Sequence, residues 1–308
     1  MLAGTALAVG GAFTLSACGP RPPMFAGSLD IACGETGGTY IRFGRLLADT
    51  MMRLGICGSS TALVTHGSVE NLMLLERDEA QLALSLADSA ADNDWPPMAI
   101  GRVYQNYLQC FVRADGPIRV ASDLAGRVIS VGAPGSGTST TSMRALRALG
   151  LMPATGPEFV ARQLDLATAA SGIASGSVDA LMWSGGIPAP EIVALQTTTE
   201  LRLMDLSAAI APLNREHDGV YQHTLIPAEV YGQEFDVDAL GVPNFLLCRP
   251  DLPDAVAAAI VDMLIDSARA LVPEPSAGVQ YLTPSSLIAT SPVPLHPGAA
   301  RRYTERYG

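Results

Sequence analysis

The chain alternates between short apolar runs and segments whose apolar residues recur every three or four positions. The apolar run LDIAC at 29–33 is followed by a helical pattern at 39–55, and Gly55 is a plausible residue to end that helix. The succession continues with a strand-like TALVTH, a helical SVENLMLLERDE and a strand-like AQLALSL. Alternating strands and helices of this length predict an α/β fold with a mostly parallel sheet and helices on its faces.

The same alternation starts again in the second part of the chain. After the strand-like YLQCFVRAD and the Gly116–Pro117 turn, the strand-like RVISVG begins a second series, and a strand-and-helix unit at 242–271 resembles a return to the first domain. The Pro-rich end of the chain closes with a short predicted helix. We therefore predict lobe 1 over 29–115 plus 243–308, and lobe 2 over 116–242.

The first residues have the pattern of an export signal. Residues 1–17 are uncharged, small and apolar, and the tetrapeptide LSAC that ends at Cys18 resembles the lipobox of bacterial lipoproteins. We expect a signal peptide at 1–17, then a lipidated Cys18 and a Pro/Gly-rich linker at 18–28. These features predict an extracytoplasmic or periplasmic protein anchored to the membrane by lipid, with plain secretion as the alternative.

Composition removes several classes of function. The net charge is −11, which disfavours a nucleic-acid partner, and every basic residue is Arg, so a Schiff-base lysine and a phosphate-binding P-loop lysine are excluded. The cysteines after Cys18 form no C-x-x-C pair. Cys110 and Cys248 are the pair to test for a disulfide, and free buried thiols throughout are the alternative.

Two glycine-rich turns carry the candidate chemistry. GAPGSGTS at 132–139 has the glycine spacing of a nucleotide-binding loop, but Thr138 stands where that loop needs its lysine. Backbone N–H groups at Ser136, Gly137 and Thr138, with the hydroxyls of Ser136, Thr138 and Ser139, could still hold a carboxylate or a small phosphate at a helix N-terminus, unless the turn is purely structural. The first turn, GETGGTY at 34–40, lacks the dinucleotide pattern G-x-G-x-x-G.

Other candidates have simpler interpretations. Ser68 in HGSVEN is expected to cap a helix, and Asp88 with Asp92 and Asp94 is interpreted as a solvated acidic loop. The four histidines show no ligand spacing, and there is no G-x-S-x-G or H-E-x-x-H motif. We therefore predict no enzymatic activity, no cofactor and no metal.

Five segments taken in order resemble one family. GGTYIRFG, HGSVENLMLLERDEAQLALSLAD, DLAGRVISVGAPGSGTS, GSVDALMWSGGIPAPEI and PLHPGAARRYTERYG resemble the TAXI family, the extracytoplasmic solute-binding proteins of one branch of the TRAP transporters. The resemblance runs from about Leu29 to the end of the chain.

The resemblance implies a two-lobed periplasmic-binding-protein fold of type II. A small carboxylate, such as glutamate, glutamine or a 2-oxo dicarboxylate, would bind between the lobes and be delivered to a sodium-driven permease. Leu86 departs from the family, which often has Gln at that place. A sensor for a membrane kinase and an enzyme on the same fold are the alternatives. The residues implied as ligand contacts are Gly38, Thr39, Tyr40, Gly67, Ser68, Asn71, Ser136, Gly137, Thr138, Trp183 and Ser184.

Overall fold

The fold is built on a ten-stranded mixed sheet. The computed structural model describes residues 22–308 except 218, 275, 279 and 280. The sheet has the order β4-β2-β5-β12-β6-β9-β7-β8, with β10 beside β6 and β11 beside β12, while β1 and β3 form a separate pair. The strands are β1 (Phe25–Ser28), β2 (Ile31–Gly34), β3 (Cys57–Ser59), β4 (Ala62–Val64), β5 (Leu82–Leu86), β6 (Met98–Arg113), β7 (Val128–Ser130), β8 (Val160–Arg162), β9 (Ala180–Gly185), β10 (Leu201–Leu203), β11 (Gln222–Ile226) and β12 (Val237–Cys248).

Parallel strands lie toward the two ends of this sheet, and antiparallel strands lie at its centre. β2 pairs in parallel with β4 and β5, β7 pairs in parallel with β8 and β9, and β6 and β12 run antiparallel between the two sets. The predicted α/β class is confirmed. The helices are α1 (Thr39–Arg53), α2 (Ser68–Glu76), α3 (Ala87–Ala91), α4 (Gly137–Ala148), α5 (Leu166–Ser175), α6 (Pro190–Gln196), α7 (Ile210–Glu216), α8 (Ala228–Tyr231), α9 (Asp254–Asp266), α10 (Pro284–Leu287) and α11 (Pro297–Tyr307).

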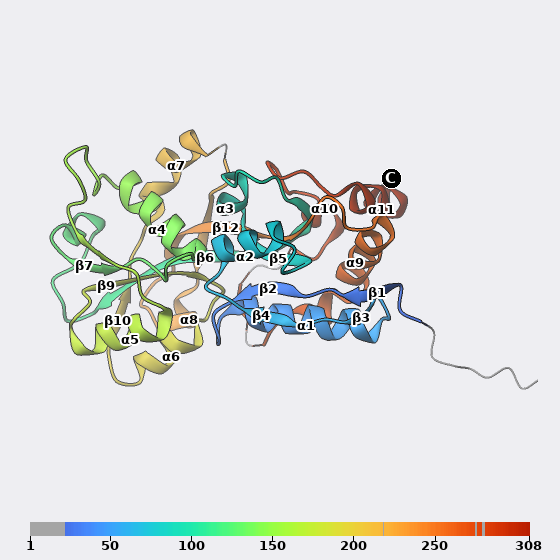
Figure 1. Cartoon of the computed structure of the whole chain (residues 1–308). Helices are drawn as coiled ribbons and strands as arrows, with labels where there is room; N and C mark the ends of the chain where they lie inside the picture. The colour runs from blue at the N-terminus through green and yellow to red at the C-terminus, as the bar shows by residue number, and fades with distance from the viewer. Residues whose placement is uncertain (1–21, 218, 275, 279–280) are drawn as a thin grey trace, which may run out of the picture.

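Two long strands connect the two halves of the molecule. Figure 1 shows the blue and red elements, from the two ends of the chain, on one side and the green and yellow elements on the other. β6 carries the chain toward the second group, and β12 runs back alongside it. The predicted boundary at 242/243 falls inside β12, and the division into lobes remains a prediction.

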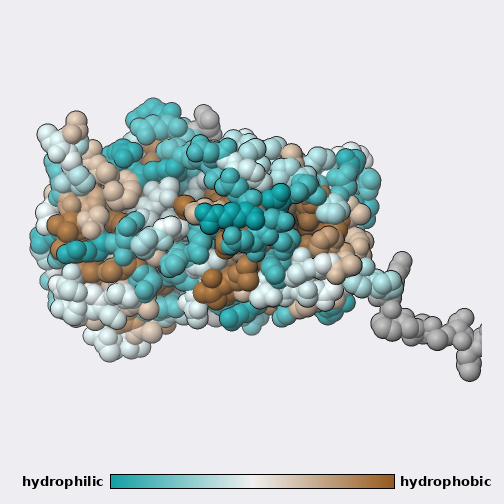
Figure 2. Space-filling model, viewed as in Figure 1, coloured by the Kyte–Doolittle hydropathy of each residue, from teal (hydrophilic) through white to brown (hydrophobic). Residues whose placement is uncertain are grey.

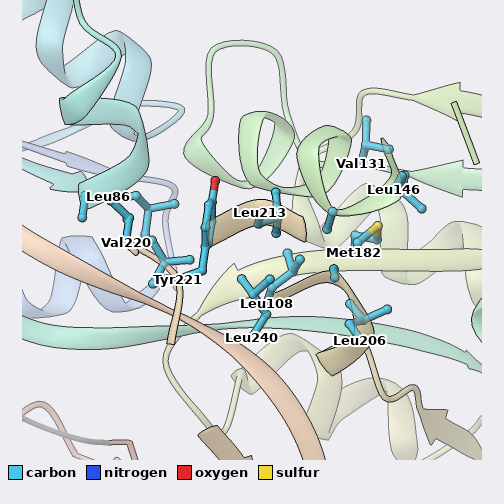
Figure 3. Packing of buried hydrophobic residues seen from close by; sticks show 14 of the residues in the cluster. Leu86, Leu108, Val131, Leu146, Met182, Leu206, Leu213, Val220, Tyr221 and Leu240 are labelled. Carbon is cyan, nitrogen blue, oxygen red and sulfur yellow. The ribbon is translucent and has the colours of Figure 1, made fainter. Parts of the chain in front are cut away.

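The largest apolar cluster joins the two halves. It packs residues of β6, β9 and β12 against α4 and α7, and Leu86, at the end of β5, belongs to the same cluster (Figure 3). Burying an aliphatic side chain of this kind contributes about 1.5–3 kcal/mol. The exposed large apolar side chains, by contrast, are scattered over separate elements, and Figure 2 shows hydrophilic residues between the apolar patches.

The strand register rules out the disulfide between Cys110 and Cys248. Cys248 lies opposite Met98 at one end of β6, whereas Cys110 pairs with Met182 of β9 near the other end. All the cysteines among the described residues are buried free thiols, which was the alternative interpretation. Burial raises the pKa of the Cys110 thiol to about 12, so this thiol is unreactive near neutral pH. Cys18 lies outside the described residues.

The helices are short relative to a membrane. Within residues 22–308, leaving out the four undescribed positions, no helix has the length and apolar character needed to cross a bilayer. Gly55 follows α1 with a φ of +68°, which confirms the predicted glycine at that helix end.

Candidate functional site

Three helix N-termini meet at one cavity between the halves of the molecule. α1 follows β2, α2 follows β4 and α4 follows β7, so each helix starts at the carboxyl end of a parallel strand, where α/β folds bind ligands. The cavity measures about 40 Å³ for a water-sized sphere. Its lining consists of Gly34, Glu35, Gly38, Thr39, Tyr40, His66, Gly67, Ser68, Leu86, Asn106, Ser136, Gly137, Thr138, Trp183, Ser184 and Gly185.

The first residues of these helices offer backbone donors to the cavity. The opening N–H groups of a helix have no partner within the helix. Among the described residues, no hydrogen bond is found for the N–H groups of Thr39, Tyr40, Ser68, Gly137 or Thr138. These N–H groups, together with the positive ends of three helix dipoles, favour an anion in the cavity.

Asn71 is the one predicted contact that the structure places outside the cavity. Its side chain is fully buried and donates to the backbone carbonyls of Cys33 and Leu84, the latter at 2.7 Å, while its amide oxygen accepts from the Thr65 hydroxyl. Asn71 therefore joins α2 to β2 and β5. All the other predicted ligand contacts line the cavity.

Several predicted hydroxyl contacts have structural partners. Ser136 caps α4, because its Oγ accepts from the Ser139 N–H at 3.0 Å and donates to the Ala133 carbonyl. The Thr138 Oγ1 accepts from the Ser184 N–H at 3.2 Å. Because both hydroxyls already have partners, the turn presents mainly backbone N–H groups to a ligand in the cavity.

Ser68 does not cap α2 as predicted. The N-cap is Gly67, whose φ of +123° and ψ of −149° belong to a backbone region that only glycine adopts readily. Ser68 instead turns its Oγ across the cavity floor, where it accepts from the Leu86 N–H at 3.0 Å. The prediction was wrong because the glycine supplies the turn without a side-chain cap.

A chain of buried polar groups supports the cavity floor. The Tyr40 hydroxyl donates to Asn244 Oδ1, and Asn244 Nδ2 donates to Asn106 Oδ1 at 2.8 Å. Asn106 in turn donates to the Ser184 carbonyl at 3.2 Å. Burial raises the pKa of the Tyr40 hydroxyl, which stays a neutral donor. The sequence missed Asn106 because it lies in the middle of a long strand with no turn signal.

One hydroxyl in the cavity has no partner. Ser184 is 6% exposed, and its Oγ makes no hydrogen bond with any described residue. A buried hydroxyl without a partner costs about 1–3 kcal/mol. A ligand in the cavity would remove this cost.

The two halves contact each other around the cavity. The Thr39 Oγ1 accepts from the Gly186 N–H at 3.2 Å, and the Glu70 N–H donates to the Gly135 carbonyl at 3.2 Å. These bonds join the N-terminal turns of α1 and α2 to the opposite half. Both bonds therefore hold the two halves together beside the cavity.

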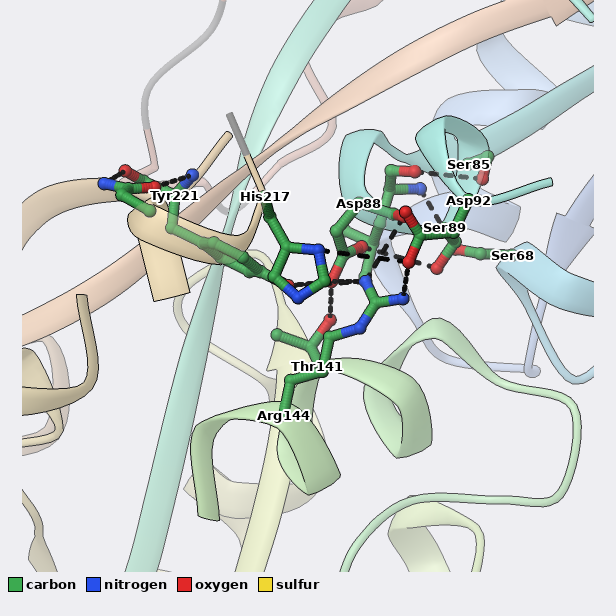
Figure 4. A network of polar contacts seen from close by, with 11 residues as sticks. Ser68, Ser85, Asp88, Ser89, Asp92, Thr141, Arg144, His217 and Tyr221 are labelled. Carbon is green, nitrogen blue, oxygen red and sulfur yellow. Dashed lines mark hydrogen bonds and ion pairs between the residues drawn. The ribbon is translucent and has the colours of Figure 1, made fainter. Parts of the chain in front are cut away.

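Asp88 also joins the halves, which corrects its interpretation as part of a solvated loop. Asp88 is 1% exposed and lies in α3. Its Oδ2 accepts from Thr141 Oγ1 at 2.7 Å and from the Tyr221 hydroxyl at 3.0 Å, and Arg144 forms an ion pair with it at 3.3 Å (Figure 4). The sequence suggested a loop because three acidic residues lie close together, but only Asp88 faces inward.

Comparison with known proteins defines the family. The model of the NMT1-like family matches residues 31–306. The chain belongs to the NMT1-like family. The narrower TAXI assignment made from the five motifs remains a prediction.

Solved structures share the fold of this NMT1-like chain. The periplasmic binding protein BugD is similar, with a TM-score of 0.51 and 15% identity over 80% of this chain and 83% of BugD. Tv2483 bound to L-arginine has a TM-score of 0.50 and 11% identity over 83% of this chain and 93% of Tv2483. The aliphatic sulphonate binding protein SsuA from Escherichia coli has a TM-score of 0.45 and 17% identity over 92% of this chain and 84% of SsuA. The similarity to BugD confirms the predicted periplasmic-binding-protein fold.

Glu35 is a charged residue of the cavity that the sequence interpretation of this NMT1-like chain overlooked. Its Oε2 accepts from the Leu166 N–H at 3.3 Å, which links the two halves once more. Burial raises the pKa of the Glu35 carboxyl, and the carboxylates of Asp165 and Glu191 raise it further. Its place directly after β2 in the first glycine turn was the available signal.

Among the described residues, no group of three or more His, Cys, Asp or Glu is arranged to hold a metal ion.

Replacing Glu35 with Gln is expected to raise the melting temperature of this NMT1-like protein at about pH 7. A carboxyl whose pKa is raised by folding stabilises the protein below its unfolded pKa of about 4.3, and this contribution is lost as pH rises through the folded pKa. The gain should therefore disappear near pH 4. Thermal unfolding at both pH values tests this, with the exposed Glu79→Gln as control. A difference in melting temperature that does not depend on pH would contradict it.

Proposed function

We propose that this protein is an extracytoplasmic solute receptor that binds a small organic anion and delivers it to a sodium-driven TRAP permease. The observation that supports this is the convergence of three helix N-termini on one cavity between two halves of the fold. Their unpartnered N–H groups form an anion site, and no Arg is among the described residues that line it.

The absence of a guanidinium from the cavity lining suits reversible binding. A buried ion pair is costly to break, because separating it leaves an uncompensated charge. Backbone N–H groups at helix ends attract an anion more weakly and are already fixed in place. A receptor that must release its solute to a permease benefits from this arrangement.

The position between the halves suits capture by closure. Binding proteins of this fold class close by a hinge movement around the ligand. Here Thr39, which lines the cavity, and Glu70, two residues beyond the cavity-lining Ser68, each form a hydrogen bond with the opposite half. A ligand that bridges the halves would favour this arrangement over an open one.

The cellular location is part of the same proposal. We place the mature protein outside the cytoplasm, in the periplasm or its equivalent, held to the membrane by a lipid on Cys18. The fold shared with the periplasmic binding protein BugD supports the location, and the LSAC motif supports the lipid anchor.

A thermal-shift screen tests the proposed function. Small carboxylates, 2-oxo acids, amino acids and sulfonates are compared with the neutral amide or alcohol of the same shape. At a concentration of about 100 times Kd, a ligand that binds only the folded protein adds about 2.7 kcal/mol of stability. We expect at least one anion, and none of the neutral analogues, to raise the melting temperature. A screen in which no small anion does so at millimolar concentration contradicts the proposal.

A further inference from the structure

A second cavity, lined by acidic residues, adjoins the anion cavity. It measures about 390 Å³, and its carboxylates are those of Glu35, Glu70, Asp165 and Glu191. The two cavities share Glu35, Gly38, His66 and Trp183 in their linings. No Arg is among the described residues that line either one. Glu35 therefore stands at the boundary between a region of N–H donors and a region of negative charge.

We propose that the site selects a small zwitterion, with Glu35 as the specificity-determining residue that contacts the cationic group. This inference rests on the proposed function, since it adds a cationic requirement to the same anion site. The anionic group lies at the helix N-termini, and an ammonium group points outward to Glu35. The ligand class is a small acid that carries an amine, either a carboxylate or a sulfonate.

The inner part of the cavity is suited to the anionic end. The N–H groups of Thr39, Ser68 and Gly137 have no partner among the described residues. Independently of these, the unpartnered Oγ of Ser184, in a residue only 6% exposed, lines the same cavity and can donate to the ligand. The unpartnered N–H groups and the unpartnered Ser184 hydroxyl thus both indicate a ligand at the inner end of the cavity, independently of the acidic residues at the outer end.

The outer end is suited to a cation. Among the described residues, Glu35 Oε2 receives one hydrogen bond, from the Leu166 N–H, so its carboxylate retains capacity for an ammonium donor. Glu191 Oε2 is buried and has no partner among the described residues. Glu70 is already paired with His66 at 2.6 Å and is less available. Trp183 lies in both linings and can present its ring to the same cation.

Charge also argues against the dianions that the sequence interpretation allowed. A dicarboxylate would place its second negative group at the end where Glu35, Asp165 and Glu191 lie. Asp165 and Glu191 line the same cavity as Glu35, and the negative charge of each raises the pKa of the Glu35 carboxyl. An ammonium group reduces the repulsion at Glu35, whereas a second carboxylate increases it.

Matched ligand pairs test the proposal on the wild-type protein. L-alanine is compared with L-lactate, and taurine with isethionate, because each pair keeps the acid and exchanges the amine for a hydroxyl. Calorimetry should show at least about tenfold tighter binding of the amine in one pair, equivalent to about 1.4 kcal/mol. Equal binding of both members overturns the zwitterion proposal and leaves the anion site intact. If neither amine nor hydroxyl acid binds, and the wider anion screen is also negative, the proposed function fails as well.

Variants assign the preference to Glu35. In Glu35→Gln the preference for the amine should fall to about twofold or less, with the hydroxyl acid binding as in wild type or more tightly. Glu191→Gln should reduce the preference less. The exposed Glu79→Gln, beyond the end of α2, keeps the full preference. A Glu35→Gln protein that still discriminates as wild type does overturns the role of Glu35.

Discussion

Replacing Gly137 with Ala is expected to weaken solute binding by about 10- to 100-fold. A Cβ at this position would lie 2.5 Å from Ser68 Oγ and 2.7 Å from Leu86 Cδ1, and both of those residues are buried in the opposite half. Overpacking of this kind costs about 1–3 kcal/mol, and here it falls on the closed arrangement in particular. Calorimetry with the best ligand of the screen measures the loss.

Gly58 provides the matched control for Gly137. A Cβ at Gly58 would meet its nearest neighbours at 3.6 Å, which is ordinary contact, and β3 lies away from the cavity. Gly58→Ala should therefore bind as the wild type does. Equal affinities for Gly137→Ala and the wild type would show that binding does not require the close approach of α4 to Ser68.

Replacing Asp88 with Ala is expected to lower the free energy of unfolding by about 3–5 kcal/mol. The side chain is fully buried and accepts from Thr141 and Tyr221, while Arg144 beside it is 15% exposed. Removing the carboxylate leaves this buried charge and these donors without their shared acceptor. Arg144 keeps its ion pair with Asp92. Because Asp92 is half-exposed, this pair compensates the Arg144 charge less than the buried Asp88 does.

Urea denaturation measures the effect of Asp88→Ala. Asp94→Ala, at an exposed position of the same acidic segment, is the control and should change stability by less than about 0.5 kcal/mol. If both variants unfold at the same urea concentration, Asp88 is not the link between the halves that its contacts indicate. Because Asp88 lies in one half and Thr141 in the other, the variant should also weaken solute binding.

Most of the residues predicted as ligand contacts lie at strand-to-helix turns and line one cavity, because turn chemistry is local and depends on neighbouring residues. Their role in binding an anion stays a prediction. The cap predicted at Ser68 was nevertheless wrong, because Gly67 with its positive φ supplies that turn, and the cap at Ser136 was not predicted. Asn106 and Asn244 could not be found in this way. They are 138 residues apart in the sequence, and only the antiparallel pairing of β6 with β12 brings their side chains together.

The long central strands were predicted only in part for a related reason. β6 is buried along nearly its whole length, so polar and apolar positions do not alternate and the pattern marks no end. The predicted strand at 107–115 covers only the last part of β6 and runs past its end at Arg113. Asp88 was misjudged because an acidic cluster looks the same in sequence whether its members face water or a buried arginine.

The structure of the protein bound to the best ligand of the screen is the most direct test of the central claim. The acidic group should lie at hydrogen-bond distance, about 2.7–3.2 Å, from the backbone nitrogens of Thr39, Ser68 and Gly137. Such contacts would establish that three helix N-termini form the anion site. A ligand bound away from this cavity, or one whose acidic group contacts none of these nitrogens, would contradict the account.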